Sequence, residues 1–248
     1  MKRNLISFLV LSVLLIFITS SAYSQFNRHV PYIEKANGLI GLQVGIPSKA
    51  MQEAIKNKMG NLGFGLGFTA LTNPFAWGRN KRNSPLRIGG ELGYTYYGRF
   101  LSEVNINGNK GDYKTSYGIV QANGIIQIRP TLPEKVSPFF EVFAGGVFYL
   151  STTKENLSAI ESSLGIPSFD FGGYSSASFN KGLAIGCSFG RPSADEPRFT
   201  MRLSYNWGNK IKYVIRNSLE YDPGSGGLVY YVGEAPVRYL MVQVGIGI

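Results

Sequence analysis

Hydrophobic and polar side chains alternate along most of this chain, and the stretch from Leu86 to Phe100 shows the pattern plainly. Every second residue from Leu86 onward is apolar, aromatic or glycine, while the residues between include Arg87 and Glu91. Successive side chains of a β-strand point to opposite faces, so this stretch predicts a strand with one apolar and one charged face. The apolar face could pack on a second sheet in a soluble sandwich. It could also face lipid while the charged face lines a closed barrel.

Seven other stretches show the same alternation, which predicts eight strands in all. The predicted strands span residues 38–46, 61–72, 86–100, 114–130, 139–150, 174–189, 198–207 and 236–248. The connections after the second, fourth and sixth strands are short, and the others are long. Outer-membrane barrels have short turns and both termini on the periplasmic side, whereas a sandwich has no reason for this parity. The sequence therefore predicts an all-β fold, an eight-stranded antiparallel up-and-down transmembrane β-barrel.

Some connections have features of their own. Ala50, Met51, Ala54 and Ile55 have the spacing of a short helix. The other predicted features are a polar loop at 101–113, an insertion at 151–173 with helical turns near 154–164, and a loop at 208–235 with a hairpin around 222–226. Glycines on one face of strand 61–72 predict close approach of bulky neighbours.

The N-terminus has the three parts of a signal peptide. Lys2 and Arg3 are basic, Leu5 to Ile18 is apolar, and Ala22-Tyr23-Ser24 is a small-x-small cleavage site. The alternative is a transmembrane anchor, for which the apolar run is short. The predicted parts are a signal peptide at 1–24, a periplasmic lead-in at 25–37 and the barrel at 38–248. The predicted location is the outer membrane of a Gram-negative bacterium.

Composition agrees with a membrane barrel and points to anionic partners. The 248 residues include 31 Gly, 15 Tyr and 16 Phe, and only 16% are charged. The net charge of +10 predicts contact with outer-membrane lipids and lipopolysaccharide phosphates, through loop residues such as Lys154, Lys181 and Lys212. A simply solvated rim is the alternative, and an exported protein rarely meets nucleic acid. The one cysteine, Cys187, cannot form an intramolecular disulfide and is expected to act as a small hydrophobic residue.

The inward-facing positions of the predicted strands gather charges of both signs. The predicted lumen ion-pair network comprises Arg87, Glu91, Arg129, Glu141, Arg198 and Arg202. Buried charges must be paired or hydrated. Because the interior of an eight-stranded barrel is filled by side chains, we expect these pairs to plug the lumen. A narrow ligand or proton path is the alternative.

Aromatic residues recur near the predicted strand ends. The predicted girdle comprises Tyr94, Tyr96, Phe100, Phe148, Tyr205 and Trp207. Such rings typically lie at the boundary between lipid and water, although a platform for stacking glycans is the alternative. Phe75 and Trp77 in the turn 73–85 are further candidate interfacial anchors.

Candidate catalytic residues are few. Hydrolytic barrels generally use a histidine as general base, and the only histidine, His29, precedes the first strand. Glu91 and Glu141 could form a carboxylate pair, but the neighbouring arginines favour ion pairs. We therefore expect no enzyme, no cofactor and no metal site.

Several motifs carry a family resemblance. They are GLQVGIP followed by SKAMQEAIKNKMG, then NLGFGLGF, NSPLRIGGELGYTYYG and the C-terminal NKIKYVIRNSLEYDPGSGGLVYYVGEAPVRYLMVQVGIGI. These resemble a family of small outer-membrane β-barrel proteins of Bacteroidota, in the OmpX-like eight-stranded class. The resemblance implies assembly by the barrel-assembly machinery. Such chains commonly end in Phe or Trp, whereas this one ends in Ile248, which weakens the expected assembly signal.

The resulting functional hypothesis is a non-enzymatic outer-membrane barrel with a structural or loop-mediated binding role. The main alternative is an accessory subunit of an envelope machine for secretion, gliding or import, with an envelope protein partner. A lipid-modifying enzyme and a small porin are less favoured.

Overall fold

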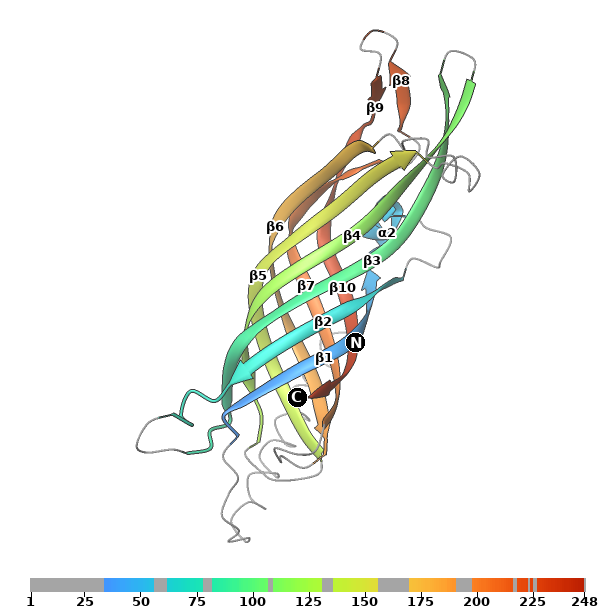
Figure 1. The fold of residues 1–248 in the computed structure, drawn as a ribbon. Helices are drawn as coiled ribbons and strands as arrows, with labels where there is room; N and C mark the ends of the chain where they lie inside the picture. The colour runs from blue at the N-terminus through green and yellow to red at the C-terminus, as the bar shows by residue number, and fades with distance from the viewer. Residues whose placement is uncertain are drawn as a thin grey trace, which may run out of the picture.

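The computed structural model describes residues 34–55, 62–77, 82–106, 109–130, 136–155, 170–190, 198–215, 218–222, 224 and 227–247. Eight of its strands form one closed antiparallel barrel, which confirms the predicted fold (Figure 1). The barrel strands are β1 (Ala36–Pro47), β2 (Gly63–Thr72), β3 (Leu86–Ile106), β4 (Asn109–Ile128), β5 (Val136–Glu155), β6 (Asp170–Phe189), β7 (Arg198–Val214) and β10 (Val232–Gly247). Each pairs with its neighbours along the chain, and β10 pairs with β1.

Three smaller elements lie between the barrel strands. Helix α2 (Lys49–Ile55) follows β1, as the sequence predicts, and β8 (Glu220–Asp222) and β9 (Gly227–Val229) form a hairpin between β7 and β10. Among the described residues, no helix is both long enough and apolar enough to cross a membrane. We call the end that carries α2 and this hairpin the upper end, as in Figure 1, and the end at which β2, β4 and β6 finish the lower end.

The wall of the barrel is uneven in height. Strands β1 and β2 have 12 and 10 residues, whereas β3 to β6 have 20 or 21. A membrane-spanning strand needs about 9–11 residues, so the taller strands continue well beyond a bilayer. Helix α2 lies beside the short strands β1 and β2, where the wall is lowest, and the Ser48 amide donates to the Arg238 carbonyl at 2.8 Å.

Most strands are longer than predicted at their upper ends. Residues 101–113 were expected to form a loop, but the β3–β4 ladder continues from Leu101↔Lys114 to Ile106↔Asn109. β5, β6, β7 and β10 also extend into the predicted loops. Above the bilayer neither strand face meets lipid, so apolar alternation stops although the backbone ladder continues. The hairpin expected around 222–226 is confirmed by the β8–β9 pairing, while residues 156–169 lie outside the described residues.

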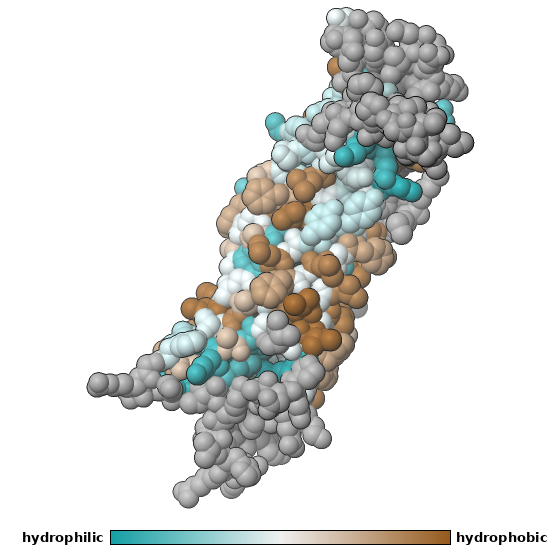
Figure 2. Space-filling view, viewed as in Figure 1, coloured by the Kyte–Doolittle hydropathy of each residue, from teal (hydrophilic) through white to brown (hydrophobic). Residues whose placement is uncertain are grey.

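The alternation separates two surfaces as expected. Large apolar side chains face outward, including Leu42 at 69% exposed, Leu66 at 61% and Leu92 at 60%. On the face seen in Figure 2, hydrophobic residues (brown), interspersed with paler ones, cover the middle of the barrel, and hydrophilic residues lie toward both ends. Charged and amide side chains point inward and are buried. This distribution is the reverse of that in a soluble protein.

A β-bulge in β3 changes which side chains face outward. The β3–β4 register shifts between Tyr96 and Gly98, where Gly98 has a φ of 99° that favours glycine. Beyond the bulge Tyr97 is fully buried, Arg99 is exposed and Phe100 packs against the interior cluster. The prediction that Phe100 belongs to an outer girdle is therefore wrong, because one extra residue exchanges the two faces.

Inward-facing glycines make room for large rings. A Cβ added to Gly63 would lie 2.6 Å from Cε1 of Tyr97, and one added to Gly182 would overlap the ring of Phe143. The expected close approach of bulky side chains to glycine is thus present, and it allows rings to fill a narrow interior.

Candidate functional site

The lower end of the barrel interior holds a cluster of three arginines around one carboxylate. Glu34, two residues before β1, accepts from Arg198 Nη1 at 3.0 Å and Arg87 Nη2 at 3.4 Å, and it contacts Arg129. All four side chains are at most 9% exposed. Burial and the neighbouring Arg198 lower the pKa of Arg129, just beyond the end of β4, to about 10. Arg129 therefore stays cationic at neutral pH, and three cations share the Glu34 carboxylate.

A second cluster lies deeper in the interior and centres on Arg202 of β7. Arg202 Nε donates to Glu141 at 2.6 Å, and Nη1 contacts Glu91 and donates to Gln243 Oε1 at 3.2 Å. The guanidinium also lies 5.5 Å from the ring centre of Phe143. The Arg202 side chain is 2% exposed. One cation therefore links carboxylates from β3 and β5 across the barrel.

Amide side chains occupy the remaining oxygens of these carboxylates. Gln121 and Asn123 donate to Glu91 Oε1 at 2.8 and 3.0 Å, and Gln127 donates to Glu141 Oε1 at 2.8 Å. A buried charge is tolerated only when its polar atoms are satisfied in this way. The arrangement leaves neither carboxylate positioned as an acid or base toward a substrate.

The upper half of the interior has a different chemistry. Four tyrosines of the interior face, Tyr97, Tyr117, Tyr149 and Tyr239, pack with apolar side chains of β4, β5, β7 and β10. Met51 of α2 is 1% exposed and joins this cluster. Helix α2 thus places an apolar side chain in the interior where the short strands β1 and β2 leave the wall low. The Tyr239 hydroxyl donates to Gln121 Oε1 at 2.8 Å and connects the aromatic half to the charged half.

The predicted interior residues fall into these two clusters. Arg87, Arg129 and Arg198 meet at the lower end, while Arg202 joins Glu91 and Glu141. Sequence reasoning missed the carboxylate of the first group, because Glu34 lies in the predicted lead-in. A signal was present: four predicted inward arginines faced only two glutamates, and burial of that excess requires another carboxylate.

The predicted outer aromatics, apart from Phe100, lie on the outer wall. Tyr94, Phe148 and Tyr205 are 45–48% exposed. The ring centres of Tyr205 and Trp207 are 5.7 Å apart. At the lower end, Trp77 is 61% exposed and donates to Thr72 Oγ1 at 3.2 Å, with the Lys35 ammonium 5.8 Å from its ring centre. A ring paired with a cation suits the boundary between lipid and water.

Basic side chains follow the apolar residues of the lower and middle outer wall, and in β6 the exposed Phe179 lies above Lys181. In the outward rows of β3 to β7 and β10, the first charged side chain met on rising from the lower end is always Lys or Arg. We call these the basic rim: Arg99, Lys114, Lys154, Lys181, Lys210 and Arg238. Lys210 also lies 3.6 Å from Glu234. Such a ring is complementary to phosphates at the surface of a membrane.

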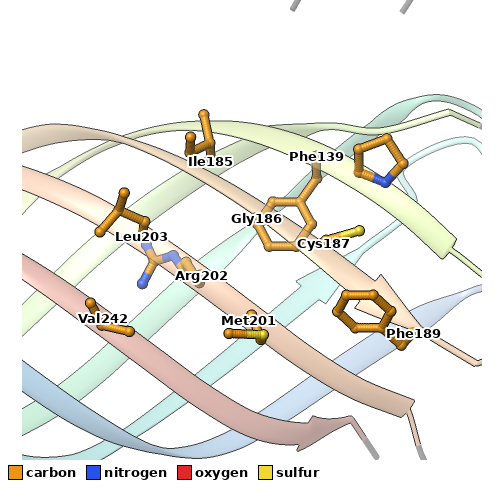
Figure 3. A pocket seen from close by; sticks show the side chains of 10 residues that line it. Phe139, Ile185, Gly186, Cys187, Phe189, Met201, Arg202, Leu203 and Val242 are labelled. Carbon is orange, nitrogen blue, oxygen red and sulfur yellow. The ribbon is translucent and has the colours of Figure 1, made fainter. Parts of the chain in front are cut away.

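The described residues offer little for catalysis or metal binding. Among them, no group of three His, Cys, Asp or Glu side chains could hold a metal ion. His29 lies outside the described residues. Cys187 is a free thiol, half-buried on the outer wall. It lines a shallow hollow with Ile185, Met201 and Val242, seen in Figure 3, and these apolar side chains suit hydrocarbon rather than a polar substrate.

Together these features define a small outer-membrane type of β-barrel, with an apolar wall around a packed interior. No protein-family model and no curated protein sequence matches the chain.

Three solved structures have a similar fold. Neisserial surface protein A (NspA) aligns with a TM-score of 0.43 and 12% identity over 86% of this chain and 96% of that one. Ail, the attachment invasion locus protein of Yersinia pestis, solved with the heparin analogue sucrose octasulfate, aligns with a TM-score of 0.37 and 14% identity over 87% and 100%. A major outer membrane protein from Thermus thermophilus aligns with a TM-score of 0.45 and 14% identity over 85% and 98%. The likeness concerns the fold, and no site residue is carried over.

Proposed function

We propose that this protein is a non-enzymatic barrel of a Gram-negative outer membrane. Its interior is closed by ion pairs and packed rings, and it acts through its upper strands and loops. The observation that carries this proposal is the contrast between its two surfaces: Leu42, Leu66 and Leu92 face outward while Arg202, Glu91 and Glu141 are buried. An apolar wall of this extent would drive aggregation in water, whereas a bilayer solvates it.

The interior contacts support a closed lumen. Arg202 crosses the bore between Glu91 and Glu141, and Glu34 and Met51 lie toward its lower and upper ends. We expect no large, stable openings when the purified full chain is inserted into planar bilayers. The triple variant E34A/R202A/M51A removes these three side chains from the lumen, and its conductance should exceed that of the unaltered protein. Stable openings by the unaltered protein would contradict the closed lumen.

The basic rim supports lipopolysaccharide as a partner. Each Lys or Arg near an anionic membrane surface contributes about 1 kcal/mol, roughly a fivefold change in affinity. R99Q/K154Q/K181Q/R238Q should weaken binding to lipopolysaccharide in detergent micelles, and the loss should disappear with dephosphorylated lipopolysaccharide. Lys35→Gln at the lower end is the control for altered charge. Equal binding by the rim variant and this control would mean that the rim does not bind lipopolysaccharide and is only hydrated charge.

A role as an accessory subunit of an envelope machine is the second candidate. It is favoured by apolar side chains that remain exposed in the upper hairpin and just after it, among them Val229 at 41% and Tyr231 at 60%. Cross-linking in native membranes followed by affinity purification tests this role. A stoichiometric envelope protein that is lost in V229S/Y231S, but kept in the rim variant, would support it.

Two further parts of the hypothesis remain predictions from the sequence. A lipid-modifying activity would alter lipid A or phospholipids, so we expect a deletion strain to keep an unchanged profile of both. Membership in the Bacteroidota family and delivery by the barrel-assembly machinery are based on motifs. Ile248→Phe should speed assembly if the C-terminal residue matters.

A further inference from the structure

A small, partly open cavity is lined by residues of both charged clusters of the lower interior. Its volume is about 20 Å³, and its lining includes Arg129 from the first cluster and Arg202 and Glu141 from the second. The hydroxyls of Thr69, Ser188 and Thr200 and the amides of Asn37 and Gln127 complete the polar part of its wall. A space of this size holds one water-sized species and excludes phosphate or sulfate.

Three lining residues have buried polar atoms without a hydrogen-bond partner in the described structure. These atoms are Arg202 Nη2, Thr69 Oγ1 and Gln127 Oε1. Arg202 Nη2 is a charged donor, and the Thr69 hydroxyl can also donate. Buried polar atoms of this kind are normally satisfied by protein, ordered water or an ion. Gln127 Oε1 is an acceptor, which the Thr69 hydroxyl or a water molecule can satisfy.

The charge of the lining indicates which species is favoured. The two clusters on either side of the cavity together contain four arginines and three glutamates, an excess of one positive charge. Arg129 also shares the carboxylate of Glu34 with Arg87 and Arg198. Inside a barrel surrounded by hydrocarbon, a cation that is only partly compensated is costly. A neutral water would satisfy the donors and leave this charge unchanged.

We propose that the cavity binds one small monovalent anion, chloride in the natural setting, held by Arg202 Nη2, the Arg129 guanidinium and the Thr69 hydroxyl. A monatomic halide is the smallest common anion, and the single excess positive charge of the two clusters matches a monovalent ion. The ion would join the two charged clusters into one network. This site is independent of any role of the loops or the rim.

The stability of the folded barrel tests the proposal. The full chain in detergent micelles is unfolded in urea, with chloride replaced by gluconate at constant ionic strength. At ten times the dissociation constant of chloride, the ratio of folded to unfolded protein should rise about tenfold over chloride-free buffer. Stability that is independent of chloride would overturn the proposal.

A pair of variants at one position sharpens the test. Thr69→Asp places a carboxylate in the cavity and should abolish the chloride dependence, whereas the similarly shaped Thr69→Asn should retain it. If the other two variants fold poorly, Thr69→Val can be used instead. It removes the hydroxyl, keeps the volume and should weaken chloride binding. Equal chloride dependence of Thr69→Asp and Thr69→Asn would contradict the site.

Crystals grown in bromide give a direct reading. We expect an anomalous peak in the cavity between Arg129 and Arg202, and its loss in Thr69→Asp. A water molecule in the cavity of the unaltered protein, without an anomalous peak, would refute the anion site.

Discussion

The lower and upper halves of the barrel interior solve the same packing problem with different chemistry. Below, Arg202, Glu91 and Glu141 hold one another through directional charged contacts. Above, Tyr97, Tyr149 and Met51 fill space with rings and a thioether. The lower half depends on each polar atom finding its partner, whereas the upper half depends on volume. Loss of one polar group should therefore be more harmful below than above.

The largest effect should follow removal of the central cation. Arg202→Leu leaves Glu91 and Glu141 buried without their shared partner, and we expect the free energy of unfolding to fall by about 3–5 kcal/mol. Urea unfolding in detergent micelles, followed by tryptophan fluorescence, measures it. Replacing both glutamates by glutamine in the same variant should restore most of the loss. A single variant as stable as the unaltered protein would show that the lower half does not depend on charge pairing.

Removal of the Glu34 carboxylate should have the second-largest effect on stability. Glu34→Gln removes the charge that Arg87, Arg129 and Arg198 share, and we expect a loss of about 1.5–3 kcal/mol in the same measurement. Glu234→Gln is the matched control, since its pair with Lys210 is solvent-exposed and should contribute less than about 1 kcal/mol. Similar losses for the two variants would mean that burial does not strengthen the Glu34 contacts.

The smallest effects are expected when either of two tyrosine hydroxyls of the upper half is removed. Tyr239→Phe breaks the bond to Gln121 and leaves that buried amide oxygen unsatisfied, which should cost about 1–3 kcal/mol. The Tyr149 hydroxyl is buried without a hydrogen-bond partner in the described structure, so Tyr149→Phe should change stability by less than about 0.5 kcal/mol. If Tyr149→Phe proved the more harmful, the upper half would depend on polar contacts as the lower half does.

The contrast between the apolar outer face and the polar inner face of the strands explains what could be predicted from the sequence. The strands were found because lipid outside and polar groups inside impose a period of two, as in Leu92 beside Glu91. Above the bilayer this contrast disappears, so the upper ends of β3 to β7 and of β10 were missed. The bulge at Gly98 leaves no signal in composition, and the face of Phe100 was therefore misjudged.

The interior could be predicted as a set of residues but not as pairs. Alternation shows that Arg87, Arg129, Arg198 and Arg202 point inward, yet only the stagger of the strands decides which carboxylate each one meets. Glu34 has no strand pattern around it and was assigned to a tail. Met51 was expected on a helix, but its packing inside the wall follows from the unequal heights of β1 and β3.

The ladder between β1 and β10 has a consequence for biogenesis. Its register joins Leu39 to Gly247 and Pro47 to Tyr239, so the first and last strands of the barrel must meet. An incomplete nascent chain cannot seal the cylinder and would present two bare strand edges, which invite aggregation. The barrel can therefore close only after all eight of its strands have been made.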